Sequence, residues 1–139
     1  MSDKVFIDTN VLVYAFDVDS GGKREVAEEV LLALRQQRSG VVSMQVLQEF
    51  YNTVTRKIAH PMPKEKARAV VDSFSQWCVE TTPAEIGRAF QIEDAARISF
   101  WDALIVAAAL KAGAQRILSE DLNPGQQIAG ILIENPFAE

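Results

Sequence analysis

Apolar residues along the chain form either short continuous runs or longer stretches with helical spacing. The continuous runs and one weaker segment predict strands at 4–8, 41–42, 79–81, 116–119 and 130–133. Apolar residues recurring every three or four positions predict helices over 10–16, 23–39, 44–58, 64–78, 83–97 and 101–112. Alternation of buried strands with helices is typical of a parallel sheet covered on both faces. The predicted fold class is α/β, a three-layer α/β/α arrangement around a short parallel central sheet, in a single domain spanning 1–139.

Several helix ends carry recognisable signals. Residues 82–85 (TPAE) form a capping box with proline at the first helical position. Gly40 is predicted to close helix 23–39, and Gly113 to close helix 101–112, because glycine favours the left-handed conformation found there. The helical stretch 44–98 is long enough for part of it to cover the sheet edge.

Three aspartates fall where such a fold would bring them together. Asp8 ends the first strand, Asp121 follows strand 116–119, and Asp102 opens a helix. Ligands bind beyond the carboxyl ends of parallel strands, and a helix antiparallel to the sheet begins at that same edge. We therefore expect these three carboxylates to meet at one rim.

Each aspartate also has a purely structural explanation. Asp8 could cap the following helix, Asp102 could form a capping box with Ser99, and Asp121 could belong to a turn with 123–125 (NPG). These separate explanations are less convincing when the three acids are taken together, because the fold would gather them at one rim. Carboxylates that close repel each other unless a cation is present. Hard oxygen ligands select Mg²⁺ or Mn²⁺.

The composition excludes several function classes. The chain has 139 residues and a net charge of −5, which argues against a protein that coats nucleic acid. No apolar run is long enough to span a membrane, and no signal peptide is visible; with the lone Cys78, this favours the cytoplasm. The single histidine, His60, is expected in a loop, so histidine-based acid–base schemes have no partner residues.

Four ordered segments then resemble a known family: "VFIDTNVLVYAFD", "SMQVLQEFYN", "SFWDALIVAAALKAGAQRILSEDL" and "ILIENPF". They are similar to the PIN domain, and specifically to the VapC-type toxin ribonucleases of type II toxin–antitoxin pairs. The resemblance runs from Val5 to Phe137, with the segments in the order and spacing of the family, and it is weakest over 60–90. It implies a Mg²⁺- or Mn²⁺-dependent endoribonuclease.

The resemblance also implies the site residues and the partners. The acidic quartet of the family falls on Asp8, Glu49, Asp102 and Asp121, and its polar helpers on Asn10 and Ser119. We expect Asp8, Asp102 and Asp121 to hold the metal directly or through water. Glu49 is expected to position or deprotonate the attacking water, or to help hold a second ion. Glu49 enters the site only through the resemblance, since helical periodicity predicts a solvated position for it. The implied partners are an RNA substrate, a cognate small antitoxin and a second copy in a homodimer.

Other functions stay open at this stage. An aspartate-nucleophile phosphotransferase also carries an aspartate at the end of strand one, but it commonly needs a second acid where Asn10 stands. A non-catalytic RNA- or protein-binding module and a PIN nuclease of RNA processing are the remaining alternatives. Lys57 and its neighbours Arg56 and Lys64 are candidates for phosphate contacts. Trp101 is expected to pack in the core, with base stacking as the alternative.

Overall fold

The computed structural model describes residues 3–138, and its centre is a five-stranded sheet with the order β2-β1-β3-β5-β4. The strands are β1 (Val5–Ile7), β2 (Gly40–Val41), β3 (Arg116–Leu118), β4 (Gln127–Ile128) and β5 (Ile131–Glu134). Strands β2, β1, β3 and β5 run parallel, and β4 pairs antiparallel with β5. All of β1 is buried, as its continuous apolar run predicts.

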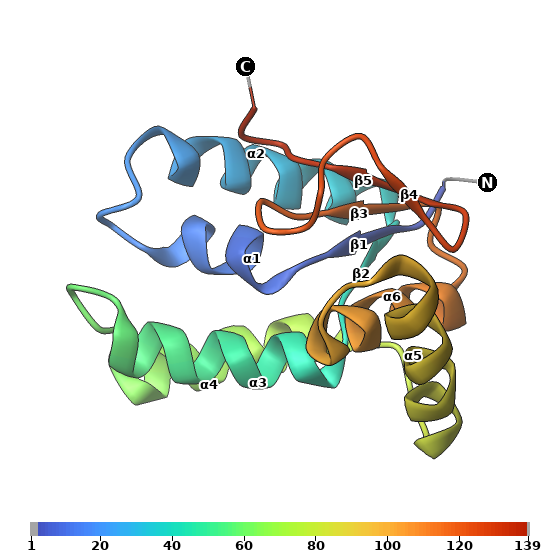
Figure 1. Cartoon of the computed structure of the whole chain (residues 1–139). Helices are drawn as coiled ribbons and strands as arrows, with labels where there is room; N and C mark the ends of the chain where they lie inside the picture. The colour runs from blue at the N-terminus through green and yellow to red at the C-terminus, as the bar shows by residue number, and fades with distance from the viewer. Residues whose placement is uncertain (1–2, 139) are drawn as a thin grey trace.

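Helices cover both faces of this sheet. They are α1 (Thr9–Phe16), α2 (Gly22–Gln37), α3 (Met44–Asn52), the π-helix η1 (Thr53–Lys57), α4 (Lys64–Phe74), the 3₁₀-helix η2 (Ser75–Trp77), α5 (Pro83–Ala96) and α6 (Phe100–Ala112). Figure 1 shows α2 on one side of the sheet, α6 with α5 against it on the other, and α3 beside α4. The predicted three-layer α/β fold is confirmed.

Two of the predicted helix ends are confirmed in detail. The Thr82 hydroxyl accepts a hydrogen bond from the Ala84 N–H (3.3 Å), and the Glu85 carboxylate accepts one from the Thr82 N–H (2.6 Å). This reciprocal capping box starts α5 at Pro83. Gly113 ends α6 with a φ of 75°, in the left-handed region where glycine is favoured.

The predicted role of Gly40 is wrong. Arg38, with a φ of 54°, takes the left-handed position that ends α2, and Gly40 begins β2. A Cβ atom at Gly40 would lie 2.3 Å from the nearest ring atom of Trp77. Glycine is needed here because the Trp77 indole lies directly on the backbone. This contact joins segments far apart in the sequence, so local helix-end signals could not predict it.

We therefore expect Gly40→Ala to destabilise the protein by about 1–3 kcal/mol, the usual cost of overpacking a core. Urea unfolding followed by circular dichroism measures this change. The matched control is Gly87→Ala in α5, where an added Cβ meets nothing within 4 Å. That variant should gain about 0.5–1 kcal/mol from helix propensity. Equal stability of Gly40→Ala and the wild type would contradict the close approach of Trp77.

The remaining differences concern the helical arm and the sheet edge. The predicted helix 44–58 changes to a π-helix at Thr53, and the Ile58 N–H donates to the Thr53 carbonyl five residues back (3.2 Å). The β-branched run 53–55 disfavours regular α-helix there. The predicted strand 79–81 does not form; an isolated bridge joins Val42 to Cys78 instead. Strand β4 was not predicted, because only one of its two residues is apolar and no continuous apolar run marks it.

No helix in residues 3–138 combines the length and the apolar character that crossing a membrane requires.

Candidate active site

A cleft of about 490 Å³ opens at the carboxyl edge of the parallel strands. Side chains from α1, α3, η1, α6 and the loop after β3 line it. The structure brings all four acids named from the sequence to this cleft, namely Asp8, Glu49, Asp102 and Asp121. The sheet geometry accounts for three of them, since Asp8 and Asp121 follow parallel strands and Asp102 lies in the first turn of α6.

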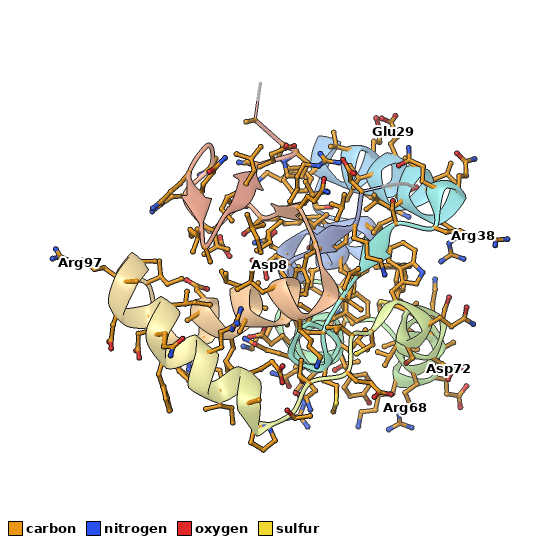
Figure 2. All side chains as sticks on the ribbon, turned by 90° about the vertical axis from the view of Figure 1, so that its right-hand side faces the viewer. Asp8, Glu29, Arg38, Arg68, Asp72 and Arg97 are labelled. Atoms are coloured by element: carbon orange, nitrogen blue, oxygen red, sulfur yellow. The ribbon has the colours of Figure 1, made fainter. Side chains whose placement is uncertain are left out.

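Asp8 is the buried member of the group. Its side chain is only 8% exposed, and Figure 2 shows it inside the molecule. The other charged residues labelled there lie at the surface: Glu29, Arg38, Arg68, Asp72 and Arg97. Burial raises the pKa of the Asp8 carboxyl from 3.8 to about 6. Burial is the largest cause of this net rise in the pKa, and the negative charges of Asp102 and Glu49 contribute to it. Hydrogen bonds from Ser119 and Thr9 act in the opposite direction and lower the pKa.

Ser119 connects Asp8 to the loop that carries Asp121. Its hydroxyl is fully buried and donates to Asp8 Oδ2 (2.7 Å). The same oxygen accepts hydrogen bonds from the N–H groups of Asp121 (3.1 Å) and Leu122 (3.2 Å). The loop after β3 therefore has its backbone anchored at the buried aspartate, which fits the supporting role predicted for Ser119.

Asn10 makes a second connection between α1 and the same loop. Its Nδ2 donates to Asp121 Oδ2 (3.0 Å), and its Oδ1 accepts from the Glu120 N–H (3.2 Å). One amide thus orients both the Asp121 side chain and the backbone beside it. The phosphotransferase alternative commonly needs an acid at this position. Here the position is an asparagine whose side chain links α1 to the loop after β3.

Glu49 is exposed on the polar face of α3, as its helical position predicts, and that face forms one wall of the cleft. The Thr9 hydroxyl donates to Glu49 Oε1 (2.8 Å), which joins α3 to the start of α1. Periodicity identifies the polar face, but only the packing of α3 across the cleft distinguishes it from ordinary surface.

Asp102 lies in the first turn of α6, where its backbone N–H donates to the Ser99 hydroxyl (3.1 Å). Only this serine half of the predicted capping box forms in the part of the chain that the structure describes. The carboxylate, half-buried, lines the cleft and acts electrostatically on Asp8.

The donor chemistry of the cleft fits a hard divalent cation. The four carboxylates offer oxygen ligands, and the mutual repulsion felt by Asp8 is what a cation would relieve. Among residues 3–138, no three His, Cys, Asp or Glu side chains are grouped closely enough to hold a metal ion. Glu49 and Asp121 are turned toward the neutral donors Thr9 and Asn10. Metal binding would therefore replace these two hydrogen bonds.

The sequence profile of the PIN domain family matches residues 5–127, which include all four acids. The chain belongs to the PIN domain family. The family resemblance seen in the sequence is thereby confirmed. No curated protein sequence matches the chain.

Solved structures share the fold of this PIN domain along nearly its whole length. A toxin–antitoxin complex from Klebsiella pneumoniae is 19% identical, covers 96% of this chain and 98% of its own, and has a TM-score of 0.73. VapBC2 from Rickettsia felis, bound to a DNA fragment from its promoter, is 19% identical, with coverages of 94% and 97% and a TM-score of 0.67. VapC20 from Mycobacterium tuberculosis, a toxin that cleaves the sarcin–ricin loop, is 19% identical, with coverages of 85% and 90% and a TM-score of 0.61. At these identities the likeness shows the fold.

One prediction about the residues around the PIN-domain cleft is wrong. Trp101 does not pack in the core; its side chain is 63% exposed at the edge of the cleft. It lies in the first turn of α6, ahead of Ala103, where the buried part of the helix begins. Lys57, in η1, lines the cleft as a candidate phosphate contact would. His60 lies in a loop as expected and bonds Asp19 through Nδ1 (2.6 Å).

Sequence reasoning missed a cluster that holds the loop between Ser119 and Asp121. The Tyr14 hydroxyl donates to Glu120 Oε1 (2.6 Å), and Lys23 Nζ lies 2.5 Å from Glu120 Oε2. The Lys23 and Tyr14 contacts hold the pKa of Glu120 below its usual range. Asn10 and Tyr14 are four residues apart on α1, so they share one face. That spacing is the one sequence signal that could have indicated a second support for this loop.

Proposed function

We propose that this PIN domain is a Mg²⁺- or Mn²⁺-dependent endoribonuclease and the toxin of a VapBC-type toxin–antitoxin pair. The observation that carries the proposal is the gathering of four carboxylates from four distant segments around one cleft. Asp8 is buried, and the charges of Asp102 and Glu49 repel its carboxylate. This repulsion supports a site that binds a cation. A cation held by carboxylates can promote the attack of water on a phosphodiester, which is the bond that links the nucleotides of RNA.

In this proposal Asp8, Asp102 and Asp121 would hold the metal. When bound, a divalent ion supplies charge stabilisation and lowers the pKa of a coordinated water. Glu49 would orient the attacking water or accept its proton. Ser119 and Asn10 fix Asp8 and Asp121 through their hydrogen bonds.

The metal requirement gives the first test. Purified protein incubated with a mixture of unstructured RNAs should cleave them in the presence of Mg²⁺ or Mn²⁺. EDTA should abolish cleavage, and excess Mn²⁺ should restore it, because the carboxylates that face the cleft repel phosphate without a cation. Products resolved on a denaturing gel provide the measurement. Cleavage that persists unchanged in EDTA would contradict a metal-dependent site.

The toxin role is supported by the fold shared with proteins solved as toxin–antitoxin complexes. Expression of this chain in a bacterial cytoplasm should arrest growth, and co-expression of a cognate small antitoxin should relieve the arrest. Colony counts after induction measure both effects. RNA cleavage without growth arrest would instead favour a PIN nuclease of RNA processing, and the absence of both would favour a non-catalytic binding module.

The proposed homodimer is tested separately by sedimentation of the chain alone. A dimer at micromolar concentration is the expected result, and a monomer under the same conditions would contradict it.

A further inference from the structure

An exposed aromatic side chain stands at the edge of the acidic cleft. Trp101 directly precedes Asp102 in α6, lines the cleft and is 63% exposed. Leaving a side chain of this size in water forgoes the stabilisation that its burial would provide. The position of the indole therefore calls for a ligand that covers it when the cleft is occupied.

The indole is supported from behind by other aromatic rings. Phe100 packs edge-on against it, with ring centroids 5.3 Å apart, and Phe90 from α5 packs on Phe100 at 5.7 Å. The Trp101 carbonyl accepts a hydrogen bond from Gln45 Nε2 (3.2 Å), which ties this turn of α6 to α3. The ring is thus held on one side and open on the other, as a preorganised binding surface should be.

The charges around the cleft limit what can bind there through phosphates. Among the described residues that line it, one lysine, Lys57, faces five carboxylates, those of Asp8, Asp17, Glu49, Asp102 and Asp121. Without a bound metal ion, the carboxylates of the cleft would repel the phosphates of a nucleic acid that binds through its backbone alone. Additional affinity has to come from a part of the substrate that carries no charge.

We propose that Trp101 stacks a nucleobase of an unpaired RNA segment beside the phosphate that is cleaved, with Phe100 and Phe90 supporting the ring. The inference rests on the proposed nuclease function and deepens it by naming the form of the substrate. A base within a duplex has both faces covered by its neighbours, so only an unstacked base can present a face to the indole. The site therefore selects single-stranded segments or loops over duplex RNA.

The negative charge of the cleft argues against a second copy of this chain as the occupant of the exposed Trp101 face. A second copy carries the same net charge of −5, and seating it on Trp101 would bring acidic residues toward the carboxylates of the cleft. A nucleobase is uncharged and planar, and stacking on an aromatic ring contributes about 1–3 kcal/mol per base.

The binding experiment uses Ca²⁺ in place of Mg²⁺ to occupy oxygen ligands, with a short unstructured RNA and a duplex of the same sequence as probes. Trp101→Ala should lower the affinity for the unstructured RNA by about 5- to 150-fold. Trp101→Phe, which keeps a ring, should retain most of the affinity, and duplex binding should stay equally weak in all three proteins. The slope of affinity against salt should not change, because stacking releases no counterions. The matched control is Leu32→Ala, a comparably exposed residue (57%) on α2 outside the cleft.

Cleavage assays in Mg²⁺ separate this inference from the proposed function. Trp101→Ala should raise KM more than it lowers kcat, since stacking contributes to substrate binding. Unchanged RNA affinity, or an equal loss for duplex and unpaired RNA, would overturn the stacking role even if the wild type cleaves RNA. A shift from dimer to monomer on sedimentation of Trp101→Ala would also overturn it, by assigning the ring to an interface between copies. If Trp101→Ala selectively loses affinity for unpaired RNA while the wild type never cleaves RNA, the stacking role is upheld and the nuclease function is refuted.

Discussion

Asp102→Asn is expected to reduce RNA cleavage at least about 10³-fold. Under the proposed function the Asp102 carboxylate would help hold the metal, and such a ligand contributes several kcal/mol to stabilisation of the transition state. The substitution keeps the backbone N–H that donates to Ser99 and keeps the shape of the side chain. The fold should therefore survive, with a cost of about 0.3–1 kcal/mol from the lost charge at the start of the helix. Initial rates in Mg²⁺ and the circular dichroism spectrum are the two measurements.

The matched control is Asp72→Asn, the same change of charge on the outer surface of α4, far from the cleft. It should cleave RNA at the wild-type rate. Full activity in Asp102→Asn would show that the acids of this cleft do not form the active site. Loss of activity in both variants would point to a general effect of charge and would equally contradict the assignment.

The meeting of the acids at one edge follows from local rules that the sequence carries. Asp8 ends an apolar strand, and Asp102 opens a helix that returns antiparallel to the sheet, so the topology alone puts both at the carboxyl edge. The helix boundaries around them follow from caps such as Thr82 and Gly113. These signals involve residues close together in sequence, which is why they could be predicted.

The parts that could not be predicted depend on packing between distant segments. Glu49 occupies a polar helix face, and only the placement of α3 opposite α1 makes that face a wall of the cleft. Trp101 belongs to a helix that is apolar on nearly every side, so periodicity does not show which of its residues emerges at the surface. Gly40 is explained by Trp77, a residue far along the chain.

The buried carboxylate makes a second prediction about stability without metal. The pKa of Asp8 in the folded protein, about 6, lies above its ordinary value of 3.8, so the fold binds this proton more tightly than the unfolded chain does. The ionised Asp8 carboxylate does not destabilise the fold below pH 3.8, the pKa of this group in the unfolded chain. The destabilisation grows as the pH rises from 3.8 toward 6 and is complete above about pH 6. At about 1.4 kcal/mol per pH unit, it amounts to about 3 kcal/mol.

Asp8→Asn removes this destabilisation but also weakens the contact with Ser119. The serine oxygen already accepts two backbone hydrogen bonds, so an amide NH₂ in place of Oδ2 loses the bond from the hydroxyl, at a cost of about 1 kcal/mol. In EDTA the variant should be about 1 kcal/mol less stable than the wild type near pH 4 and about 2 kcal/mol more stable near pH 7.5.

Urea unfolding across this range in EDTA should therefore give two stability curves that cross, whereas Asp72→Asn should show no such crossing. A difference between Asp8→Asn and the wild type that does not depend on pH would contradict the raised pKa. Adding Mg²⁺ near pH 7.5 should then stabilise the wild type more than Asp8→Asn. A cation that binds only the folded state and needs the Asp8 carboxylate would shift the unfolding equilibrium of the wild type alone. A buried carboxylate that its neighbours repel lowers the stability of the fold when it is ionised, and under the proposed function a bound cation would restore that stability.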